Sequence, residues 1–515
     1  MLLRGGSVLG PDGAFERADV LIEGDRITDV GPDLAPGSEV IDCGSRVILP
    51  GLIDAHSHAD AAVFDPAVQL ALLRQGVTTI VGGQDGVSFA PGDGAYASRY
   101  FASINGEHPN YRGGGVGALL AGYDGAIPLN AAYLAPAGTI RHEVMGSSAV
   151  PATPDQLATM RSLLRGALEE GAVGLSTGLD YAPGIFADAA ELAALCEEVA
   201  AVDGLYATHM RGGYEANAAV GFAEIAEIVR LSGVRAHVSH LHGPIPLLLD
   251  LLDGSGLSFD AYPYSRGCTL LAMLVLPPEW ATPGSRALAD ALLSEGRDAV
   301  VATIRTRVLA RPDLGTDWAE QITFSHLGAP RLGSYAGRTV AEVAAAFEDD
   351  PAELVLDVLL ECDLQVSAIM RVPSPRTPQQ LAELFRHPGH TGGSDGIFVG
   401  SHPHPRAFGT FARYLAEYVG GGLLDWATAV SHLSTNPARL FRLGDRGSVR
   451  RGAIADLVVT DAAALAARST YADPTLVASG IDDVLVAGRP VLRGGDLTGE
   501  LAGRGIRRAP HQGEG

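Results

Sequence analysis

Residues 171–243 contain five alternating segments: GAVGLSTG (171–178), AAELAALCEEVAAVDG (189–204), LYATHM (205–210), FAEIAEIVRLSG (222–233) and VRAHVSHLHG (234–243). The first, third and fifth are short apolar runs typical of buried strands, and the other two space their apolar residues as amphipathic helices do. Such alternation predicts a parallel sheet covered by helices. The same rhythm continues through most of residues 51–440, and it predicts an α/β fold, a (β/α)8 barrel of the TIM type.

The two ends of the chain have a different pattern. Residues 1–50 alternate apolar and polar side chains between glycines and aspartates, and GAIADLVVTD (452–461) has the same character. We predict that residues 1–50 and 441–515 meet in one small β-sandwich domain, while residues 51–440 form the barrel. The rhythm of the barrel breaks between about 275 and 350, where we predict an insertion near the barrel mouth.

Composition limits the partners. The chain carries 60 acidic and 37 basic residues, a formal net charge of −23, and it contains no lysine, so arginine supplies all of the basic residues. This charge repels phosphate backbones and anionic lipids, which argues against nucleic acid and membrane partners and favours a small-molecule substrate. The N-terminus has no signal-peptide pattern and the four cysteines show no disulfide spacing, which favours the cytoplasm; the oligomeric state stays open.

Histidines follow several of the apolar runs. His56 and His58 come directly after LPGLIDA, and two residues that are two apart on extended chain face the same side. His209 and His240 end the runs LYATH and RAHVSH, so two pairs of histidines from three strands would meet at one edge of the barrel. His242, two residues after His240, could face the same way. Because zinc readily takes imidazole nitrogen, the set predicts a site for one or two Zn²⁺ ions.

Two carboxylates complete this set. Asp395 lies in HTGGSDGIFVG, where a turn aspartate is the plain alternative, but the histidines upstream favour a general base and acid. A two-metal site also needs a bridging anion. Carboxylated lysine is one solution in such barrels, and a chain without lysine cannot form it. The best remaining candidate is Asp85, in GVTTIVGGQDGVSFAP.

These motifs resemble those of the amidohydrolase superfamily, and within it the N-acyl-D-amino-acid deacylases, or D-aminoacylases. The likeness extends over nearly the whole chain. The HxH motif is common to many metal hydrolases, but GLSTGLDYAPG (174–184) and HPHPRAFGTF (402–411) are far more specific to this branch.

The resemblance implies a zinc-dependent hydrolase with a barrel and a β-sandwich built from both chain ends. It would cut the amide bond of N-acyl-D-amino acids, or of related D-configured amides, to a carboxylate and a free amine. In that case His209 and His240 would hold the tightly bound zinc, His56 and His58 would line a weaker position, and Asp395 would transfer protons.

The resemblance also implies a substrate-binding set. Arg406 would bind the α-carboxylate with help from Tyr262. Three positions depart from the family: Asp85 stands where a bridging cysteine is usual, His242 where a lysine is usual, and Cys268 where a serine assists carboxylate binding. These changes affect the expected substrate more than the expected reaction.

Three alternatives stay open at this point. A cyclic-amide hydrolase of the hydantoinase type favours the carboxylated lysine that this chain cannot form. A D-peptidase or a tailoring deacylase of a biosynthetic pathway would use the same residues on a different amide. A catalytically inactive binding or regulatory relative would be expected to have lost some of the five residues His56, His58, His209, His240 and Asp395, all of which are present.

Overall fold

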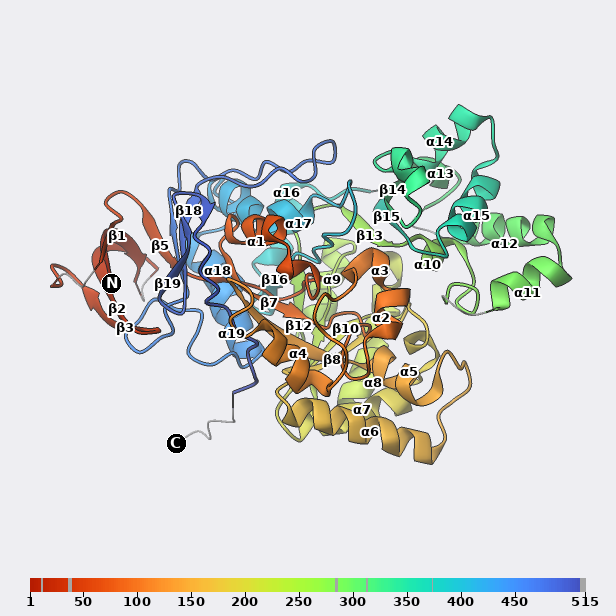
Figure 1. Ribbon diagram of the computed structural model, residues 1–515, viewed down its shortest axis with the longest axis horizontal. Helices are drawn as coiled ribbons and strands as arrows, with labels where there is room; N and C mark the ends of the chain where they lie inside the picture. The colour runs from red at the N-terminus through yellow and green to blue at the C-terminus, as the bar shows by residue number, and fades with distance from the viewer. Residues whose placement is uncertain (11–12, 36–38, 283–285, 312–313, 373, 510–515) are drawn as a thin grey trace.

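The computed structural model describes residues 1–10, 13–35, 39–282, 286–311, 314–372 and 374–509. Its central part is an eight-stranded parallel sheet in the order β16–β12–β11–β10–β9–β8–β7–β6, curled into a barrel (Figure 1). The strands are β6 (Leu52–Asp54), β7 (Val77–Gly82), β8 (Asn130–Pro136), β9 (Gly174–Gly178), β10 (Leu205–His209), β11 (Arg235–Val238), β12 (Ser258–Ala261) and β16 (His390–Gly392).

The first and last strands of the barrel, β6 and β16, meet just beyond their C-terminal ends. Ser57 and Gly396 form a parallel bridge there. The amide of Asp395 donates to the carbonyl of His56 over 2.8 Å, and the amide of His58 donates to the carbonyl of Gly396 over 3.1 Å. These bonds close the barrel at the edge where catalytic residues are expected. The predicted (β/α)8 barrel is therefore confirmed.

Helices cover the outside of the barrel, and α6 shows how the sequence sets their limits. Its first residue is Pro154, and Thr153 and Gln156 form a capping box in which each side chain accepts from the other residue's amide. The barrel helices are α1 (Pro66–Leu73), α2 (Ala95–Tyr100), α3 (Ala102–Asn105), α4 (Gly115–Tyr123), α5 (Ala137–Met145), α6 (Pro154–Glu169), α7 (Ala189–Ala200), α8 (Ala218–Ser232), α9 (Ile245–Leu252), α16 (Pro378–Phe385), α17 (Arg406–Arg413), α18 (Trp426–Val430) and α19 (Asn436–Leu440).

Both ends of the chain join one β domain, as predicted. Its nine-stranded sheet has the order β20–β19–β18–β17–β5–β1–β2–β3, with β4 paired to β1. The junction between the two ends is the antiparallel pair β17–β5, in which Leu457 faces Pro50. The strands are β1 (Leu2–Leu9), β2 (Phe15–Glu23), β3 (Arg26–Gly31), β4 (Val40–Asp42), β5 (Val47–Pro50), β17 (Leu457–Thr460), β18 (Ile481–Val486), β19 (Arg489–Arg493) and β20 (Asp496–Leu497).

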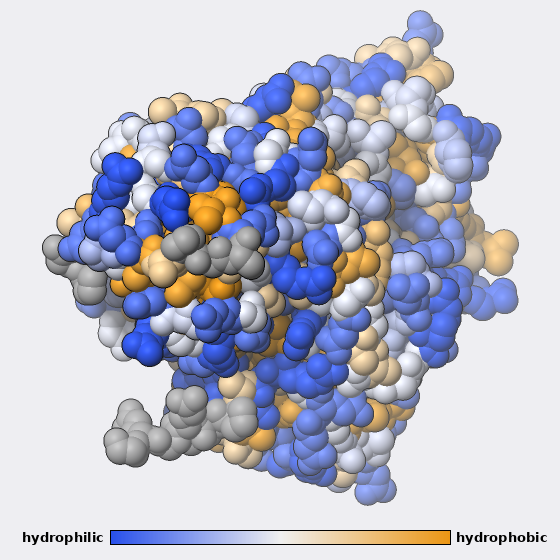
Figure 2. All heavy atoms as spheres, turned by 60° about the vertical axis from the view of Figure 1, so that its left-hand side comes forward, coloured by the Kyte–Doolittle hydropathy of each residue, from blue (hydrophilic) through white to orange (hydrophobic). Residues whose placement is uncertain are grey.

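The surface that includes this β domain comes forward in Figure 2. It is largely hydrophilic, with separate apolar areas rather than one continuous apolar face. Phe15 and Val40 are among the large apolar side chains exposed on the β domain. In the part of the chain that the structure describes, no helix is both long and apolar enough to cross a membrane.

A further unit projects from the barrel at the end opposite the β domain (Figure 1). It has its own apolar core, which includes Leu271, Val301, Phe324 and Ala368. The prediction of an insertion at 275–350 falls inside this unit, and the exact division of the chain into domains stays a prediction. Its elements are β13 (Arg266–Leu270), α10 (Leu271–Val275), α11 (Ala287–Ser294), α12 (Arg297–Ala310), α13 (Trp318–Gln321), β14 (Ile322–Leu327), α14 (Val340–Phe347), α15 (Pro351–Glu361) and β15 (Val366–Arg371).

A buried histidine at the start of β16 should make the fold sensitive to acid. His390 contacts His432 at 3.2 Å and Tyr414 at 3.1 Å. Burial, and next the neighbouring His432, hold the pKa of His390 well below its usual value. The unfolded chain takes up a proton near pH 6.5 and the folded chain does not, so this contribution is present above pH 6.5 and is lost as the pH falls below it.

The expected loss is about 1.4 kcal/mol of unfolding free energy for each pH unit below about 6.5. Urea unfolding at pH 6.5 and pH 5.5 measures it, and the His390→Asn variant should lose about this much of the wild-type pH dependence. An identical pH dependence in the two proteins would contradict the assignment.

Candidate metal centre and catalytic site

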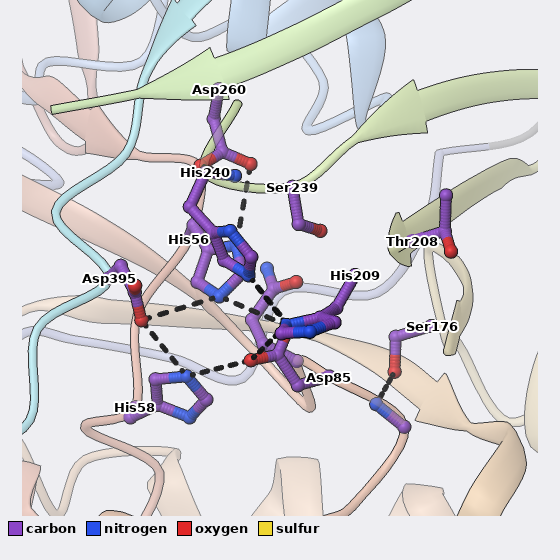
Figure 3. Close-up of polar contacts among 12 residues, drawn as sticks. His56, His58, Asp85, Ser176, Thr208, His209, Ser239, His240, Asp260 and Asp395 are labelled. Atoms are coloured by element: carbon purple, nitrogen blue, oxygen red, sulfur yellow. Dashed lines mark hydrogen bonds and ion pairs between the residues drawn. The ribbon is translucent and has the colours of Figure 1, made fainter. Parts of the chain in front are cut away.

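Six functional side chains converge where the barrel closes (Figure 3). His56 and His58 lie in the loop after β6, and Asp85 lies in the loop after β7. The other three are His209 at the end of β10, His240 just after β11 and Asp395 just after β16. All six are at least 90% buried. The fold therefore brings together the residues that the sequence singled out at the ends of five separate strands.

Asp85 lies between the two pairs of histidines. One carboxylate oxygen, Oδ1, is 3.6 Å from Nε2 of His56 and 3.6 Å from Nε2 of His240. The other, Oδ2, is 3.6 Å from Nε2 of His58 and 3.9 Å from Nδ1 of His209. Each oxygen thus faces one histidine of each pair, which is the position a bridging ligand must take between two metal ions.

The donor atoms form two overlapping groups that could each hold an ion. His56, His58, Asp85 and Asp395 make one group, and Asp85, His209 and His240 make the other; within each group the donor atoms lie within 4.8 Å of one another. Nε2 of His56 and Oδ1 of Asp85 are buried without a hydrogen-bond partner among the described residues. Since buried polar atoms are normally satisfied, this points to a ligand at their centre.

The buried histidines and carboxylates of the cluster shift one another's pKa values. Burial lowers the pKa of His58, but hydrogen bonds with Asp395 and Asp85 outweigh it and raise the pKa to about 10. Burial raises the pKa of Asp85, but the surrounding histidines hold it well below its usual range. Imidazole and carboxylate together suit a divalent cation such as zinc, so the donor set fits the metal that the sequence predicts.

Three of these residues have an unusual backbone. Asp85, His240 and Asp395 have φ angles of 54°, 36° and 48°, in the left-handed region that residues other than glycine seldom adopt. Each follows the end of a barrel strand, where the change of direction turns its side chain toward the centre. Such conformations gather at functional sites because the surrounding structure holds them in place.

A second layer of side chains orients the histidines. Asp260, on β12, accepts from the amide of His240 over 2.8 Å and lies 3.3 Å from Nδ1 of His56. Asp180, just after β9, contacts Nε2 of His209 at 3.1 Å. Such contacts fix the ring orientation of a metal-binding histidine and raise its basicity. Nδ1 of His58 contacts Oδ1 of Asn105 in the same way, at 2.9 Å.

Arg406, the first residue of α17, lies beside Asp395. Its Nη2 is 2.7 Å from Oδ2 of Asp395, and its Nε donates to the Asp395 backbone carbonyl over 2.6 Å. The guanidinium carbon lies 4.7 Å from the centre of the Tyr262 ring. Nη1 of Arg406 is buried and has no hydrogen-bond partner in the described residues. It is therefore available to an anion that enters the site.

A cavity of about 760 Å³ opens onto the centre. Its walls include His58, Asp85, Asp395, Arg406 and Tyr262. This volume suits a small organic molecule of ordinary ligand size. Both the metal-binding cluster and the buried arginine are thus within reach of one substrate.

Comparison with known proteins identifies the family. The model of the amidohydrolase family matches residues 39–492. The chain belongs to this family. It is 32% identical to the D-aminoacylase of Alcaligenes xylosoxydans xylosoxydans, over 99% of this chain and 97% of that protein. It is 31% identical to the N-acyl-D-glutamate deacylase of the same organism, over 95% of this chain and 92% of that protein.

Solved structures agree with this placement of the amidohydrolase. The N-acyl-D-glutamate deacylase of Bordetella bronchiseptica, solved with zinc and a phosphonate mimic of the tetrahedral intermediate, superposes with a TM-score of 0.80 at 27% identity, covering 98% of this chain and 99% of that chain. A D-aminoacylase superposes with a TM-score of 0.81 at 28% identity and the same coverage. The resemblance seen in the sequence motifs is confirmed.

Two predicted substrate contacts of this amidohydrolase lie at the cavity wall with partners of their own. His242 stacks on Tyr214, with ring centres 4.6 Å apart, and its Nδ1 is 2.8 Å from Oε1 of Glu215. Cys268 accepts a hydrogen bond from Arg406 through its backbone carbonyl over 3.3 Å, and burial raises the pKa of its thiol to about 11. Both residues face the cavity, and their roles toward a substrate stay predictions.

The sequence reasoning missed the second layer of this site. Asp180 lies within GLSTGLDYAPG, one of the motifs on which the resemblance was based, and Asp260 lies in β12. The signal available for them was their position, since each closely follows or ends a barrel strand as the ligands do. Asn105 lies at the end of α3 in a connection without a comparable pattern, so no sequence signal pointed to it.

Proposed function

We propose that the protein is a zinc-dependent amidohydrolase that cleaves the amide bond of N-acyl-D-amino acids, or of closely related D-configured amides. One observation carries the proposal: Asp85 is shared by two pairs of buried histidines, with Asp395 facing the same centre. The relatives named above as D-aminoacylase and N-acyl-D-glutamate deacylase support the substrate class.

The histidine pairs and Asp85 are the residues that would hold zinc. Zinc held there would supply a lowered pKa for a water molecule and polarisation of the scissile carbonyl. The carboxylate of Asp395 accepts the proton that this water loses as its oxygen bonds to the carbonyl carbon. As the carbon–nitrogen bond breaks, Asp395 gives that proton to the departing nitrogen. The new carboxylic acid releases its remaining proton to solvent, so the products are a carboxylate and a free amine.

Arg406 and Tyr262 position the amino-acid half of the substrate. The free Nη1 of Arg406 can donate to the α-carboxylate, while Nη2 holds Asp395 at 2.7 Å. The arginine thus links the carboxylate-binding position to the proton-transferring group. Because this anchor lies on one side of the cluster, only one configuration at the α-carbon would place the amide over the metal position.

We also propose that the protein acts on small molecules in the cytoplasm. The net charge of −23 opposes binding to nucleic acid. The four cysteines are all free and buried, which suits a reducing compartment.

Paired substrates test the function. Zinc-reconstituted protein is expected to release free amine from N-acetyl-D-amino acids and not from their L-enantiomers. Activity should disappear after treatment with a chelator and return with added zinc, because the reaction needs the ion for both water activation and carbonyl polarisation. Zinc content is measured in the same samples. Equal rates on D- and L-substrates, or no release from any member with zinc bound, would overturn the proposal.

A further inference from the structure

Two histidines precede the arginine of the motif HPHPRAFGTF (402–411), and the reaction described above uses neither of them. The second, His404, is fully buried. Its Nδ1 accepts from the backbone amide of Arg406 over 3.0 Å. Because Arg406 is the first residue of α17, its amide has no partner within the helix and needs an acceptor from outside it. His404 therefore holds the backbone from which the arginine side chain starts.

Other partners of this motif come from near the C-terminal end of the chain. Residues 461–480 connect β17 to β18 and form the blue loop that runs along the top of Figure 1. The hydroxyl of Ser469 donates to the carbonyl of Pro405 over 3.0 Å, and the hydroxyl oxygen of Tyr471 lies 3.2 Å from Nε2 of His404. The carbonyl and the amide of the peptide bond that follows Pro405 are thus both held, one by this loop and the other through the histidine.

Close packing fixes the loop against α17. A side-chain carbon added at Gly409 would collide with the hydroxyl oxygen of Ser469, so the helix has room for the serine only because this residue is glycine. Nε2 of His402 donates to the backbone carbonyl of Tyr471 over 2.9 Å. The guanidinium carbon of Arg266 lies 3.8 Å from the centre of the Tyr471 ring. Both the backbone and the ring of the tyrosine are therefore held in place.

The contacts of His404 determine its tautomer. A backbone amide can only donate, so Nδ1 carries a lone pair and Nε2 carries the proton that it donates to Tyr471. Burial, and next the charges of Arg406 and Arg266, hold the pKa of His404 well below its usual value. The ring therefore stays neutral, and the tyrosine oxygen is the partner that keeps the proton on Nε2.

We propose that Ser469, Tyr471 and His404 are positioning residues that aim Arg406 at the substrate. The inference rests on the proposed function, in which Arg406 binds the α-carboxylate, and it adds a role for the β domain in substrate binding. Nε and Nη2 of Arg406 are held by Asp395 at the far end of the side chain. With the backbone held as well, the free Nη1 points in a single direction, and a shift of the backbone would turn it away from the carboxylate.

The test compares substrates with and without the α-carboxylate. The N-acetyl-D-amino acid that is turned over fastest is paired with its α-carboxamide, and the wild-type protein is expected to prefer the acid by about tenfold or more in kcat/KM. Tyr471→Phe removes only a hydroxyl group. It should lower kcat/KM for the acid about three- to tenfold, mainly by raising KM, and leave the amide within about twofold. Ser469→Ala should have the same effect.

Thr470→Ala is the matched control. It removes a hydroxyl group from the exposed residue between the two, whose oxygen accepts from the amide of Asp473 within the same loop. The rates on acid and amide should both stay unchanged. If Ser469 and Tyr471 only stabilised the fold, their variants would lose acid and amide activity equally. That result, or a wild-type protein without a preference for the acid, would overturn the inference.

Replacing His404 gives a second readout. The side-chain oxygen of asparagine lies near the position of Nδ1, so His404→Asn can still accept from the amide of Arg406, whereas His404→Leu cannot. The preference for the acid should largely survive in the asparagine variant and fall about tenfold in the leucine variant. Zinc content should be the same in both, because His404 belongs to neither donor group. An equal acid preference in the two variants would contradict the positioning role.

Binding without turnover separates this inference from the proposed reaction. Calorimetry on the zinc-loaded protein uses D-alanine with a methylphosphonyl group on its nitrogen in place of acetyl, and the α-carboxamide of the same compound. Tyr471→Phe should weaken binding of the acid about three- to tenfold and leave the carboxamide within about twofold. If no D-substrate is turned over but this difference is found, the reaction assignment is wrong and the positioning role stands. If both compounds are weakened equally, or neither is, the positioning role is wrong.

Discussion

Replacing Asp395 with asparagine should lower kcat about a thousandfold or more, the largest effect expected from any single change in this protein. Asparagine fills the same space but cannot accept a proton from water or deliver one to the leaving nitrogen. The donor group of Asp85, His209 and His240 is untouched, so the variant should retain zinc there. Steady-state kinetics on the best D-substrate measure the loss, and elemental analysis of the same preparation measures the metal.

Asp180→Asn is the informative comparison for Asp395→Asn. It removes a negative charge from the same cavity, but Asp180 contacts His209, whereas Asp395 contacts His58. A residue that only orients a metal-binding histidine should cost about ten- to a hundredfold in activity or metal affinity. Full activity in Asp395→Asn would show that proton transfer is performed by another group.

Replacing Asp85 with alanine should empty both metal positions. Each of its two oxygens faces one histidine from each pair, at 3.6–3.9 Å. The change therefore removes a ligand and a negative charge from both metal positions at once. Two cations bound to the remaining histidines would repel each other, because the negative charge between them would be gone. We expect zinc content after dialysis to fall to a small fraction of the wild-type value and activity to fall with it.

Asp85→Cys is the control that separates bridging from simple charge. A thiolate can also bridge, and it favours softer ions such as zinc over manganese relative to a carboxylate. The cysteine variant should therefore retain zinc and lose part of any manganese binding, as competition experiments with the two ions would reveal. If alanine at this position left zinc content unchanged, Asp85 would not be a ligand.

The sequence predicted most of the site because strand ends are easy to recognise. His56, His209 and His240 stand at the ends of short apolar runs, and a parallel barrel places all such ends on one edge. What it could not predict depends on packing between distant segments. The contact of Asp260 with both His56 and His240 arises only when the loops after β6 and β11 reach β12. The pairing of Arg406 with Asp395 arises only when the start of α17 reaches the loop after β16.

The projecting unit shows the same limit. A break in the strand–helix rhythm indicated an insertion, but no pattern indicated that β13 and β15 would pair and that α12 would turn Arg307 toward the cavity. Those features depend on an apolar core that forms between segments as distant as Leu271 and Ala368. Periodicity describes single elements, whereas these features depend on how elements meet.

The closure of the barrel between β6 and β16 also determines when the protein becomes active during its synthesis. His56 is translated early and Asp395 late, yet their backbones are bonded to each other at 2.8 Å. A nascent chain that still lacks β16 has an open edge at β6, which is paired only with β7, and its histidine cluster lacks Asp395. Activity should therefore arise in one step, after Arg406 has left the ribosomal exit tunnel, and shorter chains should have none.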